Sequence, residues 1–174
     1  MKKSPILNNR NKWMAIGVAA LLLASCDTNK IYETHLRIPD DGWKQNDIKR
    51  FNVYVADTAS ACNIYINVRN NNQYKSMELW LFVTVGSPSG KRQRDTVSIR
   101  IADEYGKWIG NGLGSHFDTR LLFQKDIRFP ETGIFTFEYE QGMRDEPLIG
   151  VEDIGLRIEK SESSSLADEE MQNK

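Results

Sequence analysis

The sequence predicts an all-β fold: a single antiparallel β-sandwich, jelly-roll-like and of about seven or eight strands, behind a cleaved N-terminal signal peptide. Apolar and polar residues alternate with a period of two in several short segments between residues 46 and 160. Turn residues separate these segments at short intervals, as they do in sandwiches. After the first 25 residues, no stretch of ten or more residues shows a period of 3.6, so we expect no long helix.

The composition favours one folded domain. The chain has 174 residues, of which 40% are hydrophobic, and this is enough to bury a core. Its formal net charge is -1, but the first 25 residues hold four basic residues and no acidic one, so the remainder is near -5. This mildly acidic body lacks the basic stripe that nucleic acid or anionic headgroups require. We therefore expect no nucleic-acid partner, and other proteins or an uncharged polymer such as a glycan instead.

The N-terminus has the three parts of an export signal. Basic residues lead into an apolar run of 12 residues, Trp13 to Ala24, and small residues follow it. A helix of that length is about 18 Å long, well short of the roughly 30 Å of bilayer hydrocarbon. We therefore expect residues 1–25 to be a signal peptide that is removed, and not a transmembrane anchor.

The end of this signal resembles the lipobox of bacterial lipoproteins, through Leu23, Ala24, Ser25 and Cys26. The resemblance implies cleavage between Ser25 and Cys26, a diacylglyceryl group on the Cys26 thiol, and usually a further acyl chain such as palmitate on the new amine. Each buried CH₂ contributes about 0.8 kcal/mol, so two or three chains hold a protein stably on a membrane. The alternative is an ordinary secretory signal with a bystander cysteine. No cofactor is expected apart from this covalent lipid.

The chain has only one other cysteine, Cys62. If Cys26 carries a lipid, Cys62 has no partner within the chain, and a disulfide framework is excluded. Cys62 lies in an apolar-patterned segment, which predicts a small core residue.

The first elements follow from the change in pattern after Cys26. Residues 26–45 are polar and turn-rich, as expected for a lipid-anchored tether, and their few apolar residues predict a first edge segment. The sandwich is expected over residues 46–160, beginning with strands around 51–55 and 64–68, where every second residue is apolar. Residues 79–85 are apolar on both faces, which is typical of a central strand.

A hairpin and a loop come next. Residues 87–90 contain Pro88 and Gly90 and predict a tight turn, which joins the central strand to an alternating segment at 97–101. Residues 103–118 carry four glycines and break the alternation, so they predict a long surface loop.

The last part of the chain is less regular. Residues 121–123 fit a short strand or a helical turn. Clean alternation then predicts strands at 135–139, with Glu138 and Glu140 outward, and at 154–158. Residues 161–174 are polar, acidic and of low complexity, which predicts a disordered tail.

No catalytic or metal-binding motif stands out. The two histidines, His35 and His116, lack a second ligand at metal spacing, so we expect no metal site. Glu138 and Glu140 lie about 6.7 Å apart on one strand face, a separation compatible with a glycosidase pair, although paired outward acids commonly keep a sheet soluble. We expect no catalytic residues and no enzymatic activity.

Aromatic residues in turn-like segments are the more informative surface candidates. An exposed ring there stacks on a sugar or anchors a protein partner. The alternative is that each ring packs over a sandwich edge as a lid on the core. The candidate contact residues are Trp43, Tyr105 and Trp108, with Tyr74 as a further ring of the same kind.

Several longer stretches resemble a known family. These are "DGWKQNDIKRFNV", "ELWLFVTVGSPSG", "DEYGKWIGNGLG" and above all "RFPETGIFTFEYEQGMRDEPLIGVEDIGLRIEK", which resemble the gliding motility lipoprotein GldH family of the Bacteroidota. The resemblance runs from the lipobox to Lys160. It implies a non-enzymatic envelope lipoprotein of the gliding apparatus, linked in motile members to the type IX secretion machinery. It supplies no catalytic or ligand-binding residues apart from the lipidated Cys26.

The most specific part of this resemblance, "QGMRDEPL", is also a structural feature. It follows a strong strand, and its Gly and Pro predict an ordered loop. The loop either closes the sandwich or presents a docking surface. The candidate interaction residues are Gln141, Gly142, Met143, Arg144 and Asp145.

The residues after Cys26 suggest a location. Surface-exported lipoproteins of the Bacteroidota typically carry several acids just behind the cysteine, whereas Asp27 stands alone here. The resemblance therefore implies the periplasmic face of the outer membrane. The leading hypothesis is a binding or assembly component of an envelope complex, and the alternative is a carbohydrate-binding accessory lipoprotein that uses exposed aromatic rings.

Overall fold

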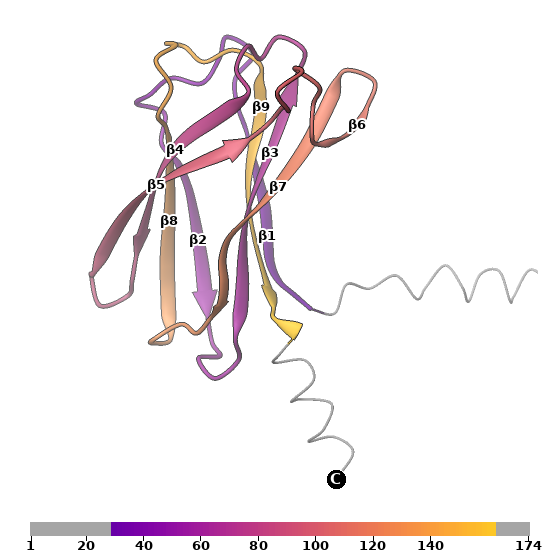
Figure 1. Cartoon of the computed structure of the whole chain (residues 1–174). Coiled ribbons are helices and arrows are strands. Elements are labelled where there is room, and N and C mark those ends of the chain that lie inside the picture. Colours follow the sequence, from indigo (N-terminus) through magenta and orange to yellow (C-terminus); the bar gives the residue numbers. More distant parts are fainter. Residues whose placement is uncertain (1–28, 163–174) are drawn as a thin grey trace, which may run out of the picture.

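Nine strands in two antiparallel sheets make up the sandwich in a computed structural model, which describes residues 29–162 of the chain (Figure 1). The predicted all-β sandwich is confirmed. The expected signal peptide, the cleavage site at Ser25, the lipidated Cys26 and most of the expected tail lie outside the described residues. No helix within residues 29–162 is long and apolar enough to cross a membrane.

One sheet has five strands in the order β1-β9-β3-β7-β6. Their bounds are Lys30–Arg37 for β1, Val151–Lys160 for β9, Cys62–Asn71 for β3, His116–Ile127 for β7 and Asn111–Leu113 for β6. The first edge segment expected before residue 46 is therefore the strand β1, which pairs with β9 along its whole length.

The other sheet has four strands in the order β2-β8-β4-β5. Their bounds are Lys49–Val55 for β2, Gly133–Gln141 for β8, Glu78–Gly86 for β4 and Arg92–Arg100 for β5. With the short β6 set aside, β1 pairs with β9, β2 with β8, β3 with β7 and β4 with β5. This nested pairing of early with late strands is the jelly-roll order.

The core lies between the sheets and follows from the alternation. Alternate residues along β2, β3, β8 and β9 point inward and are buried, which confirms the strand faces that the sequence predicts there. Each fully buried aliphatic or aromatic side chain stabilises the fold by about 1.5–3 kcal/mol relative to an exposed one. Cys62 is a free, buried thiol whose Sγ contacts the Ser60 carbonyl, and burial raises its pKa, so it is the expected core residue.

Two segments are more regular than the sequence predicts. Residues 121–123, which fit a strand or a helical turn, belong to the long strand β7. None of the residues of β7 is fully buried, because this strand lies near an open side of the sandwich. Its two faces therefore differ little in burial, and the consecutive apolar residues Leu121, Leu122 and Phe123 show no alternation in the sequence. The expected glycine-rich loop contains the short strand β6, where the ring of Phe117 packs so closely on Gly112 that no side chain fits there.

The central strand β4 is interior to its sheet, as expected, but only one of its faces is covered. Leu79, Leu81 and Val83 are fully buried in the core. Trp80 lies on the outer face and is 44% exposed. The apolar residues on both faces of β4 are thus explained by its position between β8 and β5 within the sheet. They do not indicate a further layer packed on its outer face.

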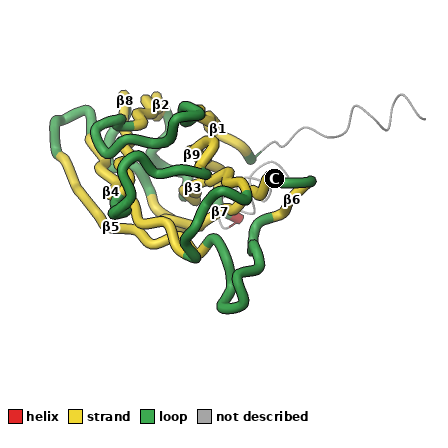
Figure 2. Tube along the Cα trace, turned by 90° about the horizontal axis from the view of Figure 1, so that it is seen from above, coloured by secondary structure: helices red, strands yellow, loops and turns green. Residues whose placement is uncertain are grey.

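The two ends of the sandwich differ in what they carry. Asn29 and Lys160 lie together at one end, joined by a hydrogen bond of 2.8 Å from the Lys160 N–H to the Asn29 carbonyl. We call this the proximal end. The opposite end carries the loops 38–48, 72–77, 101–110 and 142–150, which cover the strands when the molecule is seen from above (Figures 1 and 2). We call it the distal end.

Candidate functional site

Trp43 closes the distal end from inside. Its backbone N–H donates to the Leu148 carbonyl and its carbonyl accepts from the Leu148 N–H, both at 2.9 Å. Its indole is 0% exposed, and Nε1 donates to the Asp47 carbonyl at 2.8 Å. The expectation that Trp43 is an exposed contact residue is wrong, because the loop folds its ring over the core and satisfies its only polar group there.

Tyr74 is a second ring of the distal core. It is buried, and its hydroxyl donates to the Glu78 carbonyl at 2.8 Å. Burial away from water raises its pKa well above the ordinary value for tyrosine. Tyr74 is therefore also unavailable to an external partner.

Trp108 and Tyr105 lie nearer the surface. Trp108 is partly buried, with its ring 5.5 Å from that of Phe117 and its Nε1 donating to Asn72 Oδ1 at 3.1 Å. Tyr105 is 87% exposed. Of the four rings singled out in the sequence, only Tyr105 is fully offered to solvent, so these four do not form a stacking platform for a sugar.

The loop that begins at Gln141 is held by its own side chains. Gln141 is buried, and its Nε2 donates to the Asp145 carbonyl and to Glu146 Oε2, both at 3.2 Å. Its Oε1 accepts from the Met143 N–H at 2.8 Å. One amide side chain thus fixes the loop at three points.

The same loop is joined to its neighbours. The Gly142 N–H donates to the Trp80 carbonyl at 2.7 Å, and Gln45 Nε2 donates to the Met143 carbonyl at 2.9 Å. These contacts favour the reading in which the loop closes the sandwich. The side chains of Arg144 and Asp145 are exposed, so they are a part of the loop that is open to solvent.

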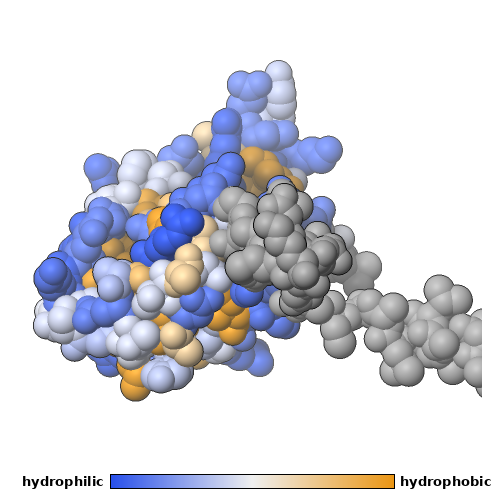
Figure 3. Space-filling model, turned by 90° about the horizontal axis from the view of Figure 1, so that it is seen from below, coloured by the Kyte–Doolittle hydropathy of each residue, from blue (hydrophilic) through white to orange (hydrophobic). Residues whose placement is uncertain are grey.

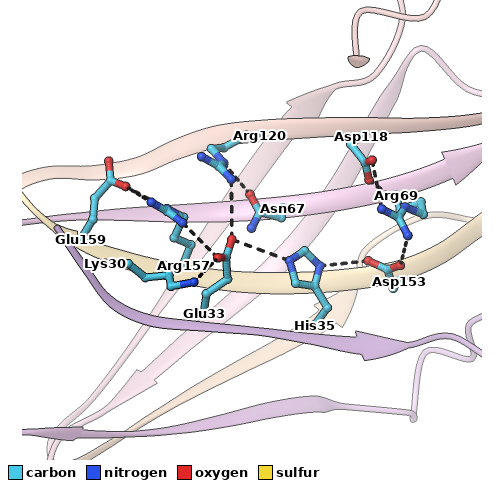
Figure 4. Close-up of polar contacts among 10 residues, drawn as sticks. All are labelled: Lys30, Glu33, His35, Asn67, Arg69, Asp118, Arg120, Asp153, Arg157 and Glu159. Carbon is cyan, nitrogen blue, oxygen red and sulfur yellow. Dashed lines mark hydrogen bonds and ion pairs between the residues drawn. The ribbon is translucent and has the colours of Figure 1, made fainter. Parts of the chain in front are cut away.

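The outer face of the five-stranded sheet carries a network of charges, which we call the polar face (Figure 4). At its distal end, Arg69 donates to Asp118 at 2.8 and 3.0 Å and lies 3.6 Å from Asp153, whose other oxygen is 3.1 Å from His35 Nδ1. The polar face consists of Lys30, Glu33, His35, Asn67, Arg69, Asp118, Arg120, Asp153, Arg157 and Glu159.

Arg157 is the buried centre of this network. It is 7% exposed, and it donates to Glu159 Oε2 at 2.8 Å and to Glu33 Oε2 at 3.0 Å. Desolvation by burial acts to raise the pKa of Glu33, but the charges of Arg157 and Lys30 outweigh it and hold this pKa below the ordinary value. A buried guanidinium requires such partners, because an unpaired charge in that position is costly.

Two neighbouring positions shape the middle of the polar face. A Cβ on Gly155 would lie 2.8 Å from Nδ1 of the His35 ring, so glycine makes room for the ring. Beside it, Arg120 Nε donates to Asn67 Oδ1 at 2.9 Å. The buried Nδ2 of Asn67 has no hydrogen-bond partner among the residues that the structure describes.

A cavity of about 560 Å³ lies at the distal end of the polar face. Its lining includes both histidines, and His116 Nδ1 is 2.7 Å from Glu152 Oε2. Burial acts to raise the pKa of Glu152, but hydrogen bonds from Asn71 and His116 outweigh it and lower the pKa. Sequence reasoning treated His35 and His116 as unrelated, because only the strand order brings β1 and β7 to the same cavity.

The residues that the structure describes bear on two kinds of site, a metal site and a two-carboxylate glycosidase site. Within residues 29–162, no three residues among His, Cys, Asp and Glu are arranged to hold a metal ion. Glu138 accepts hydrogen bonds from Arg50 and Arg92, and these outweigh desolvation and lower its pKa, the opposite of what a general acid needs. Arg94 holds both oxygens of Glu140, at 2.7 and 3.0 Å. The pair is better described as part of a charged sheet face than as a glycosidase site.

Comparison with known proteins agrees with the resemblance noted in the sequence. The "Gliding motility lipoprotein GldH homolog" of Christiangramia forsetii is 29% identical over 150 residues, 82% of this chain and 91% of that protein. The "Gliding motility lipoprotein GldH" of Flavobacterium johnsoniae is 29% identical over 152 residues, 83% of this chain and 94% of that protein. The family model described as "GldH lipoprotein" matches residues 30–158, from the first strand to the last. The chain therefore belongs to the GldH lipoprotein family.

Proposed function

We propose that this chain is a non-enzymatic envelope lipoprotein that serves as a binding or assembly component of the gliding motility apparatus or of the associated type IX secretion machinery. Its anchor is the lipid on Cys26, and its location is the periplasmic face of the outer membrane. Family membership supports the lipoprotein and motility parts of this proposal. The difference between the proximal and distal ends of the sandwich supports the assembly part.

The single observation that carries the proposal is the separation of the two ends. Cys26 precedes the first strand by four residues, and four extended residues span at most about 14 Å. A lipid at Cys26 therefore holds the proximal end next to the membrane, with little slack. The distal end, on the far side of strands of seven to twelve residues, then faces away from the membrane.

The distal end has the properties of a protein-docking surface. Its loops are pinned together by the contacts of Trp43, Leu148 and Gln141, so little order has to be gained on binding. The exposed Tyr105, Arg144 and Asp145 provide an aromatic anchor and charges of both signs on this rigid base. The adjoining cavity, with its histidines and carboxylates, extends the same surface.

Site-specific crosslinking in cells tests the proposal. A photoreactive residue is placed at Tyr105 or Arg144 at the distal end, and at Asp57 of the proximal 56–61 loop as the matched control. We expect distal positions to crosslink to envelope proteins of the motility or secretion machinery, identified by mass spectrometry, and the control position not to do so. Crosslinks to such proteins from Asp57 alone would contradict the proposed orientation.

A further inference from the structure

A second cavity, of about 690 Å³, opens at the proximal end between the β4–β5 hairpin and the end of β7. Behind it lie the core residues Phe135, Phe137 and Ile64, which are buried. At its mouth, Val85 and Ile127 are only partly buried, so their apolar side chains are open to a ligand. The cavity therefore offers an apolar surface at the edge of the core. Seen from below, this end shows hydrophobic side chains between hydrophilic ones (Figure 3).

The rim of this cavity is cationic. Lys91, Arg92 and Arg128 line it, together with the carboxylate of Glu131, and Arg92 is also paired with Glu138. The Glu131 carboxylate is already engaged, because it accepts hydrogen bonds from the Ser89 N–H at 3.2 Å and from the Ser89 hydroxyl at 2.7 Å. The ammonium group of Lys91 makes no hydrogen bond or ion pair with any residue that the structure describes. A ligand that combines acidic groups with an apolar side chain complements such a site.

The described part of the chain ends beside this cavity. The Ser161 N–H donates to the Ala61 carbonyl at 2.9 Å, and Arg128 Nε donates to the Ala59 carbonyl at 2.9 Å. The same short loop thus contacts both the end of β9 and the rim of the cavity. Cys62 of β3 pairs with Lys160 at the end of β9 on one side and with Ile127 of β7 on the other. At the usual spacing between neighbouring strands, Lys160 and Ile127 are therefore about 10 Å apart.

Residues 163–171, which follow the described part of the chain, contain a spacer, an apolar residue and acidic residues in that order. Three serines, 163–165, span about 10 Å when extended, which matches the distance from β9 to Ile127. Leu166 comes next, and then the acids Asp168, Glu169 and Glu170. We propose that segment 163–171 docks on this cavity, with Leu166 against Val85 and Ile127 at its mouth and the acids against the cationic rim.

This docking places the acidic segment at the proximal end, which the proposed function puts next to the membrane. The preformed cavity supplies an apolar contact for Leu166 and a rim of opposite charge for the acids. The contact is intramolecular, so the short serine spacer gives a high effective concentration and a modest intrinsic affinity suffices.

The test compares two forms of the chain without the lipid, residues 27–174 and residues 27–162, since the strands and core of the sandwich lie within 29–162. Hydrogen exchange is measured at segments 87–93 and 127–131. We expect exchange there to be severalfold faster in the shorter form, and a labelled peptide of residues 163–174 to restore the slower rate. Equal exchange in both forms overturns the proposal. Slowing of both forms by anionic phospholipid vesicles, with no effect of truncation, also overturns it and assigns the cavity to lipid.

Point variants separate docking from general electrostatic attraction. Lys91→Glu reverses a rim charge, and Lys75→Glu makes the same change at the distal end, where Lys75 lines a different cavity. We expect Lys91→Glu to weaken peptide binding to residues 27–162 by at least fivefold, and Lys75→Glu to leave it unchanged. Leu166→Asp in the peptide should abolish binding. Equal effects of the two lysine variants, or full binding of the Leu166→Asp peptide, would contradict the proposed contact.

Discussion

Trp43 and Leu148 exchange two backbone hydrogen bonds of 2.9 Å across 105 positions of sequence, and this pair joins the loop after β1 to the loop before β9. The fully buried indole of Trp43 lies directly behind the pair. The family-specific loop "QGMRDEPL" is held against the same pair through Gln45, which contacts both Met143 and Glu146. The most characteristic stretch of the sequence is therefore part of a rigid distal end.

Replacing Trp43 tests this rigidity. We expect Trp43→Ala to lower the free energy of unfolding by about 3–5 kcal/mol, because it removes a fully buried ring and leaves a cavity. The measurement is equilibrium denaturation in urea. Tyr105→Ala is the control, since an exposed side chain changes stability by about 0.5 kcal/mol or less. Equal effects of the two substitutions would show that Trp43 does not hold the distal end.

Arg157 provides a test of the polar face. Arg157→Met should cost about 3 kcal/mol of stability, because it leaves Glu33 and Glu159 with partly buried charges and no central partner. The combined variant Arg157→Met with Glu33→Gln and Glu159→Gln should recover most of this loss. If the triple variant is no more stable than Arg157→Met, the network is not the origin of the effect.

Gly155 and His35 form a steric pair that a double-mutant cycle can resolve. Gly155→Ala should destabilise the protein by about 1–3 kcal/mol, since the added Cβ meets the His35 ring. In the background of His35→Ser the same substitution should cost much less, because the ring is absent. A cost that does not depend on residue 35 would assign the effect to the backbone of β9 instead.

The pH dependence of stability follows from carboxylates whose pKa is lowered in the folded protein. The pKa values of three of them, Glu33, Glu138 and Glu152, lie below the ordinary value of 4.5. The pKa values of Asp57 and Glu131 are also lowered. A lowered folded pKa means that the unfolded chain takes up protons first, so the stabilisation is fully present above pH 4.5 and is lost as pH falls through the folded pKa. Urea midpoints measured from pH 7 to pH 3 should fall in the acid range. The fall should be smaller for Glu138→Gln, and an unchanged profile in that variant would contradict the role of Arg50 and Arg92.

Much of the fold could be predicted from local pattern, and much of the site could not. The strands β2, β3, β8 and β9 bury one face, so their alternation is visible in the sequence. β7 lies near an open side, where neither face is fully buried, and its pattern was therefore ambiguous. The burial of Trp43 and the presence of His35 and His116 in the lining of one cavity depend on long-range strand order, which local pattern does not encode.

The lipid on Cys26 is the central claim, because it decides which end of the sandwich faces the membrane. The most direct measurement is incorporation of labelled palmitate, together with membrane fractionation, in cells that produce the chain or its Cys26→Ala variant. We expect the chain to carry label and to sediment with the outer membrane, and the Cys26→Ala variant to do neither. Undiminished labelling and membrane association in the Cys26→Ala variant would contradict the account.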